Sequence, residues 1–176
     1  MAQAPDKWNG QKQRTDFRQQ QKPHNSSTGI DSSLELEPIP ATGGDTHQRR
    51  AAYAWKCIES AQKLGHKNAK EYGGHAKKLP MRIMAAGLGQ ALAFVYAKSH
   101  NKRHLQDLLK HLSSWVINGR GIRSPQVSKE QWLVPHIVGG NAEYLQRATD
   151  EVLAFLQWLN RFAEAEGLTD EVGDDN

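Results

Sequence analysis

Apolar residues recur at three- and four-residue intervals through most of the chain after residue 45. Such spacing places them on one face of an α-helix, and no stretch shows the strict alternation that is typical of a β-strand. The sequence therefore predicts an all-α fold, a compact bundle of about five helices. The expected helices cover residues 46–64, 68–86, 88–98, 101–117 and 142–165, and a short helix is expected near 128–133 within the loop 118–140.

Polar residues, glycines and prolines set the expected helix boundaries. Thr46 and Asn101 are plausible N-caps because their side-chain oxygens can accept hydrogen bonds from the first turn. Gly87 can adopt the positive φ that ends one helix and turns the chain, and Gly167 is expected to end the last helix. Pro80 is expected to bend its helix or to begin a new helical segment.

The apolar stripes also identify the expected core. Leu109 and Leu159 lie within these stripes and are expected to be buried. Cys57, the single cysteine of the chain, is expected to be a small and inert core residue. Four aromatic residues fall at core-facing positions of the predicted helices: Phe94, Trp115, Phe155 and Phe162.

The first 45 residues differ in composition from the rest of the chain. They are rich in Gln, Ser, Pro, Gly, Asp and Asn and show no sustained apolar period, which predicts a disordered arm or one that a partner orders. The expected organisation is an N-terminal extension over 1–45, a helical bundle domain over 46–167 and an acidic tail over 168–176. No apolar run approaches membrane-spanning length and no secretory signal is evident, so the expected location is the cytoplasm.

The net charge of +4 conceals a strong asymmetry along the chain. Residues 46–110 carry thirteen Lys or Arg against three Asp or Glu, a net charge of +10. Residues 111–176 carry five against ten, a net charge of −5. A basic block of helices favours a polyanion such as nucleic acid, whereas the acidic part favours a basic protein neighbour or simple solubility.

One group of cations recurs at a helical interval. Arg49, Lys56 and Lys63 are seven residues apart, which is nearly two helical turns, and Lys67 follows four residues later. These charges are expected to form one line along a helix, where long cationic side chains can contact phosphates.

A second group of cations precedes the break at Gly87. Lys77, Lys78 and Arg82 lie within five residues of one another and can share a surface. The alternative is an ordinary solvated basic face, which is the more common outcome for any single run of charges.

The sequence contains no constellation of residues that indicates catalysis or metal binding. His100, His104 and His111 have helical spacing, but no thiol or carboxylate completes a ligand set. Asp150 and Glu151 are adjacent, so on a helix they point about 100° apart and do not form an acid/base pair. We therefore predict no catalytic residue, no metal, no cofactor and no enzymatic activity.

Three further aromatic residues are candidates for contacts with other subunits, because interfaces are enriched in aromatic side chains. Trp158 lies opposite the main apolar stripe of the last helix, Tyr96 lies near the edge of its helix, and Trp132 lies in the expected loop.

Three blocks of sequence, taken together and in order, carry a resemblance to a known family. They are KKLP at 77–80 running into GLGQALAF at 87–94, HLSSWV at 111–116, and YLQRATDEVLAFLQWLNRFAEA at 144–165. Over residues 46–166 the chain resembles the small all-helical subunit of the type III-B CRISPR effector, the RAMP-module (Cmr) complex. The N-terminal extension and the connection around 119–140 depart from the compact pattern of that family.

The resemblance implies a non-catalytic subunit in antiviral defence, found in several copies that stack as a minor filament. Its partners would be the RAMP backbone subunits, the large Cas10-type subunit, and the guide RNA and target RNA, which it would stabilise through a basic surface. By match to the family's basic helical block, Lys77, Lys78 and Arg82 are candidates for RNA contact. Two other functions stay open: a general helical RNA-binding module, and a helical protein–protein adaptor whose basic face binds an acidic protein.

Overall fold

The computed structural model describes residues 39, 44–127 and 132–169 of the chain. The elements are α1 (Thr46–Gln62), α2 (His66–Lys98), α3 (Arg103–Ser113), the π-helical turn η1 (Ser114–Gly119), α4 (Leu133–Gly139) and α5 (Ala142–Ala165). The predicted all-α bundle of about five helices is therefore confirmed for this part of the chain. The predicted disordered arm and nearly all of the acidic tail lie outside the described residues.

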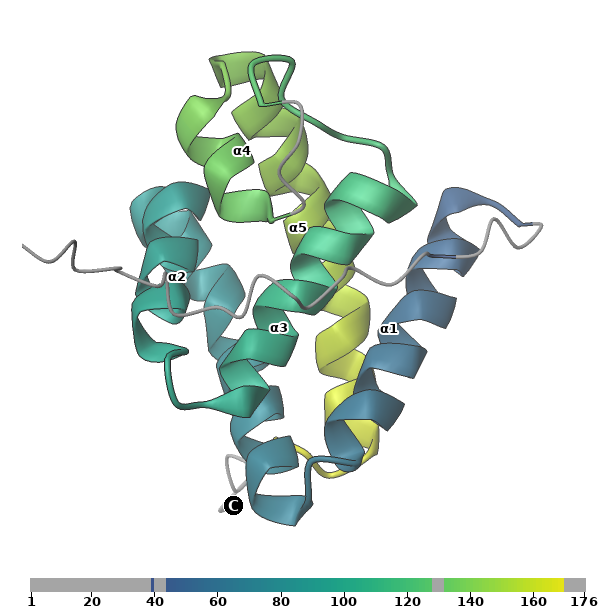
Figure 1. Cartoon of the computed structure of the whole chain (residues 1–176). Helices are drawn as coiled ribbons and strands as arrows, with labels where there is room; N and C mark the ends of the chain where they lie inside the picture. Colours follow the sequence, from purple (N-terminus) through teal and green to yellow (C-terminus); the bar gives the residue numbers. More distant parts are fainter. Residues whose placement is uncertain (1–38, 40–43, 128–131, 170–176) are drawn as a thin grey trace, which may run out of the picture.

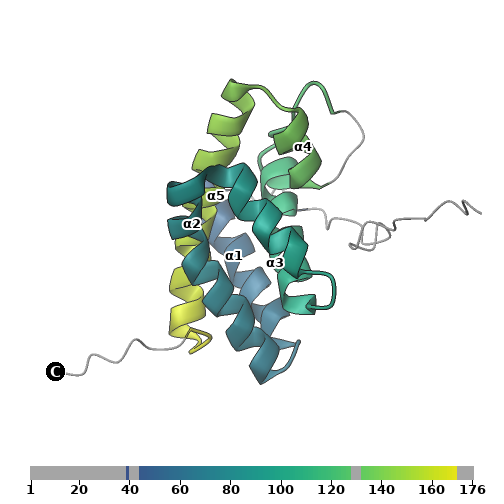
Figure 2. The ribbon, with the colours of Figure 1, turned by 90° about the vertical axis from the view of Figure 1, so that its left-hand side faces the viewer.

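The four longest helices, α1, α2, α3 and α5, pack side by side (Figure 1). Helix α5 packs against both α1 and α2, and α2 also packs against α3. Figures 1 and 2 show α4 at one end of this bundle, beside the start of α5. Helix α2 is thus held by other helices on its inner sides, and its remaining face is exposed.

Helix α2 is broken at Gly87, as the sequence predicted. Gly87 has φ 81° and ψ 160° inside an otherwise helical segment, a backbone conformation that residues with a side chain rarely adopt. Pro80 lies inside α2, and the backbone on either side of it stays helical, so of the two outcomes expected for Pro80 a new helical segment is wrong and a bend stays a prediction. By length and composition alone α2 is also apolar enough to cross a membrane, but Leu79 and Leu92 are buried in the bundle core.

The predicted core is largely confirmed. Leu109 is 3% exposed and Leu159 is fully buried, as are Trp115 and Phe155. The expectation for Phe94 is wrong, because its side chain is 39% exposed. The break at Gly87 changes which face of the following segment points into the core. The buried positions of that segment are Leu88, Ala91, Leu92 and Val95. Phe162 is partly buried and packs against the core.

Two of the predicted caps are displaced by one residue. Asp45 is the N-cap of α1, because its side chain accepts a hydrogen bond from the Gln48 backbone N–H at 2.8 Å. Thr46 is therefore the first helical residue. Lys102 precedes α3 and provides no side-chain cap, so Asn101 does not cap that helix. Asn141 caps α5 by accepting from the Tyr144 N–H at 2.8 Å.

The predicted helix 101–117 and the predicted short helix both differ from the structure. After Ser113 the helix widens into η1, where the Arg120 N–H donates to the Trp115 carbonyl at 2.9 Å, five residues back. A short helix covers Leu133–Gly139, where the sequence predicted a loop, and residues 128–131 of the predicted short helix lie outside the described residues. The Leu133 backbone N–H donates to Ser113 Oγ at 3.1 Å, so contact with α3 fixes where this helix begins.

The end of α5 packs closely on α2. Gly167 has φ 64°, and the next N–H, that of Leu168, donates to the Ala163 carbonyl at 2.8 Å. This is the hydrogen-bond pattern of a Schellman motif. Leu168 is buried, and a Cβ placed on Gly73 of α2 would lie 2.3 Å from its carbonyl oxygen. The core therefore continues past residue 167.

Candidate nucleic-acid interface

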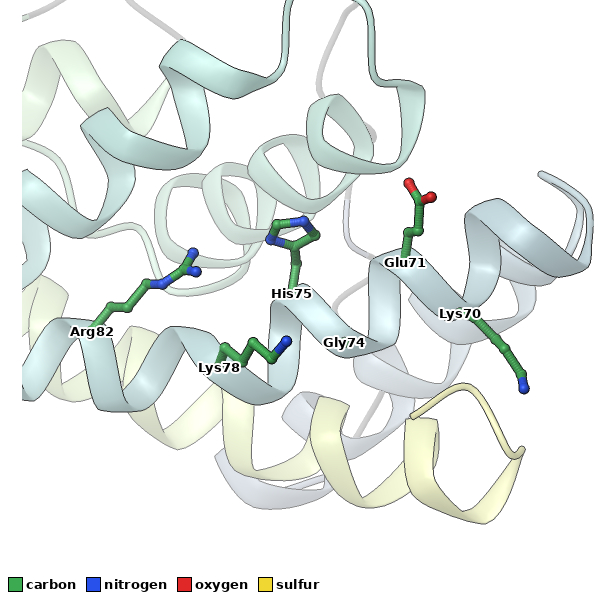
Figure 3. Close-up of a pocket in the computed structure, with 6 residues that line it drawn as sticks. All are labelled: Lys70, Glu71, Gly74, His75, Lys78 and Arg82. Carbon is green, nitrogen blue, oxygen red and sulfur yellow. The ribbon is translucent and has the colours of Figure 1, made fainter. Parts of the chain in front are cut away.

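A pocket of about 230 Å³ lies on the exposed face of α2 (Figure 3). We call it the α2 pocket, and it is lined by Lys70, Glu71, Gly74, His75, Lys78 and Arg82. Positions 70, 74, 78 and 82 are four residues apart, so they lie on consecutive turns of one helix face. Gly74 has no side chain and nothing within 4 Å of its Cβ position, which leaves a hollow in a row of cations.

Arg82 is held in place by an aromatic ring from beyond the helix break. Its guanidinium carbon lies 4.3 Å from the centre of the Phe94 ring, and Lys98 Nζ lies 4.2 Å from the same centre. A cation at this distance is attracted to the π-system. The turn at Gly87 therefore brings two cations together around one exposed ring, and this explains why Phe94 lies at the surface.

Two histidines lie between α2 and α3 at the edge of the α2 pocket. The rings of His75 and His104 stack with their centres 5.8 Å apart, and His104 Nε2 lies 3.2 Å from a Glu71 carboxylate oxygen. Burial lowers the pKa of His75, and the charges of Arg82 and other nearby cations lower it further. Burial also lowers the pKa of His104, against the opposing effect of Glu71. Both rings are therefore neutral at neutral pH.

The structure brings together two of the three cations predicted to share a surface. Lys78 and Arg82 both line the α2 pocket. Lys77 instead forms an ion pair with Glu164 of α5, with Nζ 3.2 Å from Oε1. Adjacent helical positions point about 100° apart, so Lys77 faces a different neighbour.

The predicted line of cations on the first helix is interrupted. Nη2 of Arg49 donates to the Gly119 carbonyl at 3.0 Å, which ties α1 to η1. Lys56 and Lys63 are exposed on α1 and at its C-cap. Helix α1 ends at Gln62, so Lys67 lies in the first turn of α2 and does not continue the line.

Lys70 and His75 were missed from the sequence, although a signal was present. The four-residue interval of a helix face runs through Lys70, Gly74, Lys78 and Arg82. The pattern of cations is interrupted at Gly74, because glycine carries no side chain. His75 had no spacing partner in the sequence, because its neighbour His104 comes from α3.

The three aromatic residues predicted at subunit contacts are partly buried. Trp158, Tyr96 and Trp132 all pack against the core, and their role in contacts with other subunits stays a prediction. Trp55 of α1 is 41% exposed and was missed. Its ring is nearly perpendicular to that of Phe162, with the centres 5.4 Å apart, and the Phe162 ring also lies 5.6 Å from that of Trp158.

The three histidines with helical spacing, His100, His104 and His111, have separate surroundings. His111 Nδ1 lies 2.8 Å from the Tyr72 hydroxyl, His104 approaches Glu71, and His100 is exposed beside Tyr96. Within residues 44–127 and 132–169, no group of three or more His, Cys, Asp or Glu side chains could hold a metal ion.

Comparison with known proteins places this geometry in a family. The model of a family described as CRISPR-associated protein (Cas_Cmr5) matches residues 46–166, from the start of α1 to the end of α5. The chain belongs to the Cmr5 family. A relative from Thermus thermophilus, named CRISPR system Cmr subunit Cmr5, is 33% identical over 119 residues. The match covers 66% of this chain and 94% of the relative.

Membership of the Cmr5 family confirms the resemblance to the small helical subunit of the type III-B CRISPR effector. The α2 pocket and every described helix lie within the matched residues. The extension over 1–45 precedes the match to the Cmr5 family model.

Proposed function

We propose that the protein is a non-catalytic small subunit of a type III-B CRISPR RNA-guided effector, acting in cytoplasmic antiviral defence. The observation that carries this proposal is the family match, which spans the whole helical bundle. Its partners are the RAMP backbone subunits, the large Cas10-type subunit, and further copies of the chain stacked as a minor filament.

Within that assembly, the role proposed for this subunit is to stabilise the guide RNA–target RNA pair through its basic surface. Base pairing by the guide supplies the choice of sequence, so the protein needs only contacts to the backbone. Long cationic side chains on a helix face provide such contacts. Lys78 and Arg82 in the α2 pocket, and the exposed Lys56, Lys63 and Lys67, support this role.

The absence of catalysis in the proposal is supported by how the buried ionisable groups are used. His111 bonds to Tyr72, and Glu151 accepts hydrogen bonds from Arg50 and Trp115. These contacts join helices inside the core, where a substrate has no access. These ionisable groups are therefore buried because they hold helices together, which is a structural role.

The experiment that tests the proposal is affinity capture of the tagged full-length protein from its native cells, with and without RNase. We expect RAMP-type subunits, a Cas10-type protein and short repeat-derived RNAs to be recovered together. Unrelated RNAs without those proteins would contradict the proposal and favour a general RNA-binding module. Acidic proteins without RNA would contradict it in favour of an adaptor.

A further inference from the structure

We propose that the α2 pocket is a binding site for a phosphate group of the RNA backbone, with Arg82 and Lys78 as its cationic ligands. This inference rests on the proposed function and names the place on the subunit where RNA is held. Of all the cations in residues 46–110, it assigns RNA binding to those on one face of α2.

The arrangement of charge in the pocket suits an anion. Lys70, Lys78 and Arg82 lie along one face within about 18 Å, at 1.5 Å per residue. The lining residues carry three cationic side chains against the single carboxylate of Glu71. Burial lowers the pKa of His75, and the charges of Arg82 and Lys78 are among those that lower it further.

Two polar atoms of the lining residues lack a partner. Arg82 Nη1 and His75 Nδ1 are buried and make no hydrogen bond with the residues that the structure describes. Buried polar atoms in proteins are nearly always hydrogen-bonded, and each exception needs an explanation. The ring of Phe94 holds the guanidinium of Arg82 without using its N–H donors. Phosphate and carboxylate oxygens are the acceptors that a guanidinium binds most strongly.

The composition of the pocket favours a phosphodiester over an acidic protein segment. The lining residues are lysine, glutamate, glycine, histidine and arginine, with no apolar side chain among them. Protein partners bind mainly through buried apolar or aromatic anchors, for which this pocket provides no place. A backbone phosphate needs only donors and positive charge, and several phosphate oxygens can accept from successive turns of the helix.

The test compares two double variants in the reconstituted effector complex. Lys78→Ala/Arg82→Ala removes two charges from the pocket, and Lys56→Ala/Lys63→Ala removes two charges from α1. The complex is assembled with each and its affinity for target RNA is measured over a range of salt concentrations. We expect the pocket variant to weaken binding more than the α1 variant does, and the slope of log K against log salt to fall by about 0.7 for each phosphate that the pocket variant no longer neutralises.

Lys78→Ala alone serves as a second variant, because Lys78 is exposed and its removal does not disturb the stack of Arg82 on Phe94. Thermal melting of each variant shows that it is folded. Equal losses of affinity in the two double variants would overturn the α2 pocket, since they indicate diffuse attraction, and would leave the proposed function intact. Unchanged RNA binding by the pocket variants would also overturn the phosphate site and leave the proposed function intact.

Two further outcomes separate this inference from the function on which it rests. If Lys78 crosslinks to an acidic protein segment and not to RNA in the assembled complex, the phosphate site is wrong while the subunit assignment stands. If the wild-type protein does not enter a complex with RAMP-type subunits, the proposed function fails, and the RNA site fails with it.

Discussion

At the scale of a residue, His111 is an uncharged imidazole inside the bundle. Its Nδ1 lies 2.8 Å from the Tyr72 hydroxyl. Burial lowers the pKa of His111 to about 3, with a further contribution from the charge of Lys110. Burial likewise raises the pKa of Tyr72 well above its ordinary value of 10.0. Both groups are therefore neutral throughout the physiological range, and the pair joins α2 to α3.

The pKa of His111 makes stability depend on pH. An unfolded histidine titrates near pH 6.5, so between that value and about 3 the unfolded state binds a proton that the folded state does not. The contribution of His111 to the free energy of unfolding is therefore highest above pH 6.5. Below that value it decreases by up to about 1.4 kcal/mol per pH unit as the pH falls. We expect His111→Gln, which keeps a hydrogen-bonding group for Tyr72, to flatten this dependence in urea unfolding between about pH 6.5 and 5. Equal slopes for the two proteins would contradict the expectation.

The candidate site shows how far single residues could be predicted. Helical spacing was enough to bring Lys78 and Arg82 to one face. Spacing could not show that Lys77 meets Glu164, because that contact depends on which helix packs beside α2. Nor could it show that Phe94 turns outward to hold Arg82, since the direction depends on the backbone angles at Gly87.

At the scale of elements, the two adjacent glycines of α2 have different surroundings. A Cβ on Gly73 would lie 2.3 Å from the carbonyl oxygen of Leu168, whereas nothing lies within 4 Å of a Cβ on Gly74. Gly73 is therefore the point where α2 contacts the turn after α5. A glycine inside a helix destabilises it, so its presence there needs a reason. Close packing gives that reason for Gly73 but not for Gly74.

We expect Gly73→Ala to destabilise the protein by about 1–3 kcal/mol, because the backbone of the turn must move to admit a methyl group. Gly74→Ala is the matched control, and we expect it to stabilise the fold by about 0.5–1 kcal/mol through higher helix propensity. Chemical unfolding of both variants measures the difference. No loss of stability in Gly73→Ala would show that the turn is not packed as described, and a loss in Gly74→Ala would show that the space beside Gly74 is not open.

The elements themselves were predicted where the chain follows its own periodicity. Helix α5 was predicted over 142–165 with its end at Gly167, because its apolar stripe and its stop signal are local. The division of the helix 101–117 into α3 and η1 was not predicted, since the apolar spacing is the same on both sides of Ser113 and does not show where the turn widens. The position of α4 was also missed, because Ser113 of α3 receives its first N–H.

At the scale of the whole molecule, one carboxylate joins α1, η1 and α5. Oε1 of Glu151 accepts from Arg50 Nε at 3.0 Å, from Arg50 Nη2 at 2.8 Å and from Trp115 Nε1 at 2.8 Å. Its other oxygen accepts from Arg120 Nε at 3.0 Å. Burial alone would raise the pKa of Glu151, but the hydrogen bonds from Arg50 and Trp115 outweigh it and the pKa is lowered. Helical spacing could not reveal this cluster, because Arg50 and Glu151 are 101 positions apart.

We expect Glu151→Leu to destabilise the protein by about 3–5 kcal/mol, because it leaves the buried guanidinium of Arg50 without a counter-charge. Arg120 has a more exposed side chain, at 31%, and can turn to water. Arg50→Met combined with Glu151→Leu removes both buried charges and is expected to recover most of the loss. Trp115 keeps an unpaired N–H in both variants, so about 1 kcal/mol should remain. Unfolding of the single and double variants gives the coupling energy, and additive losses would show that α1 is held by its apolar contacts with α5 alone.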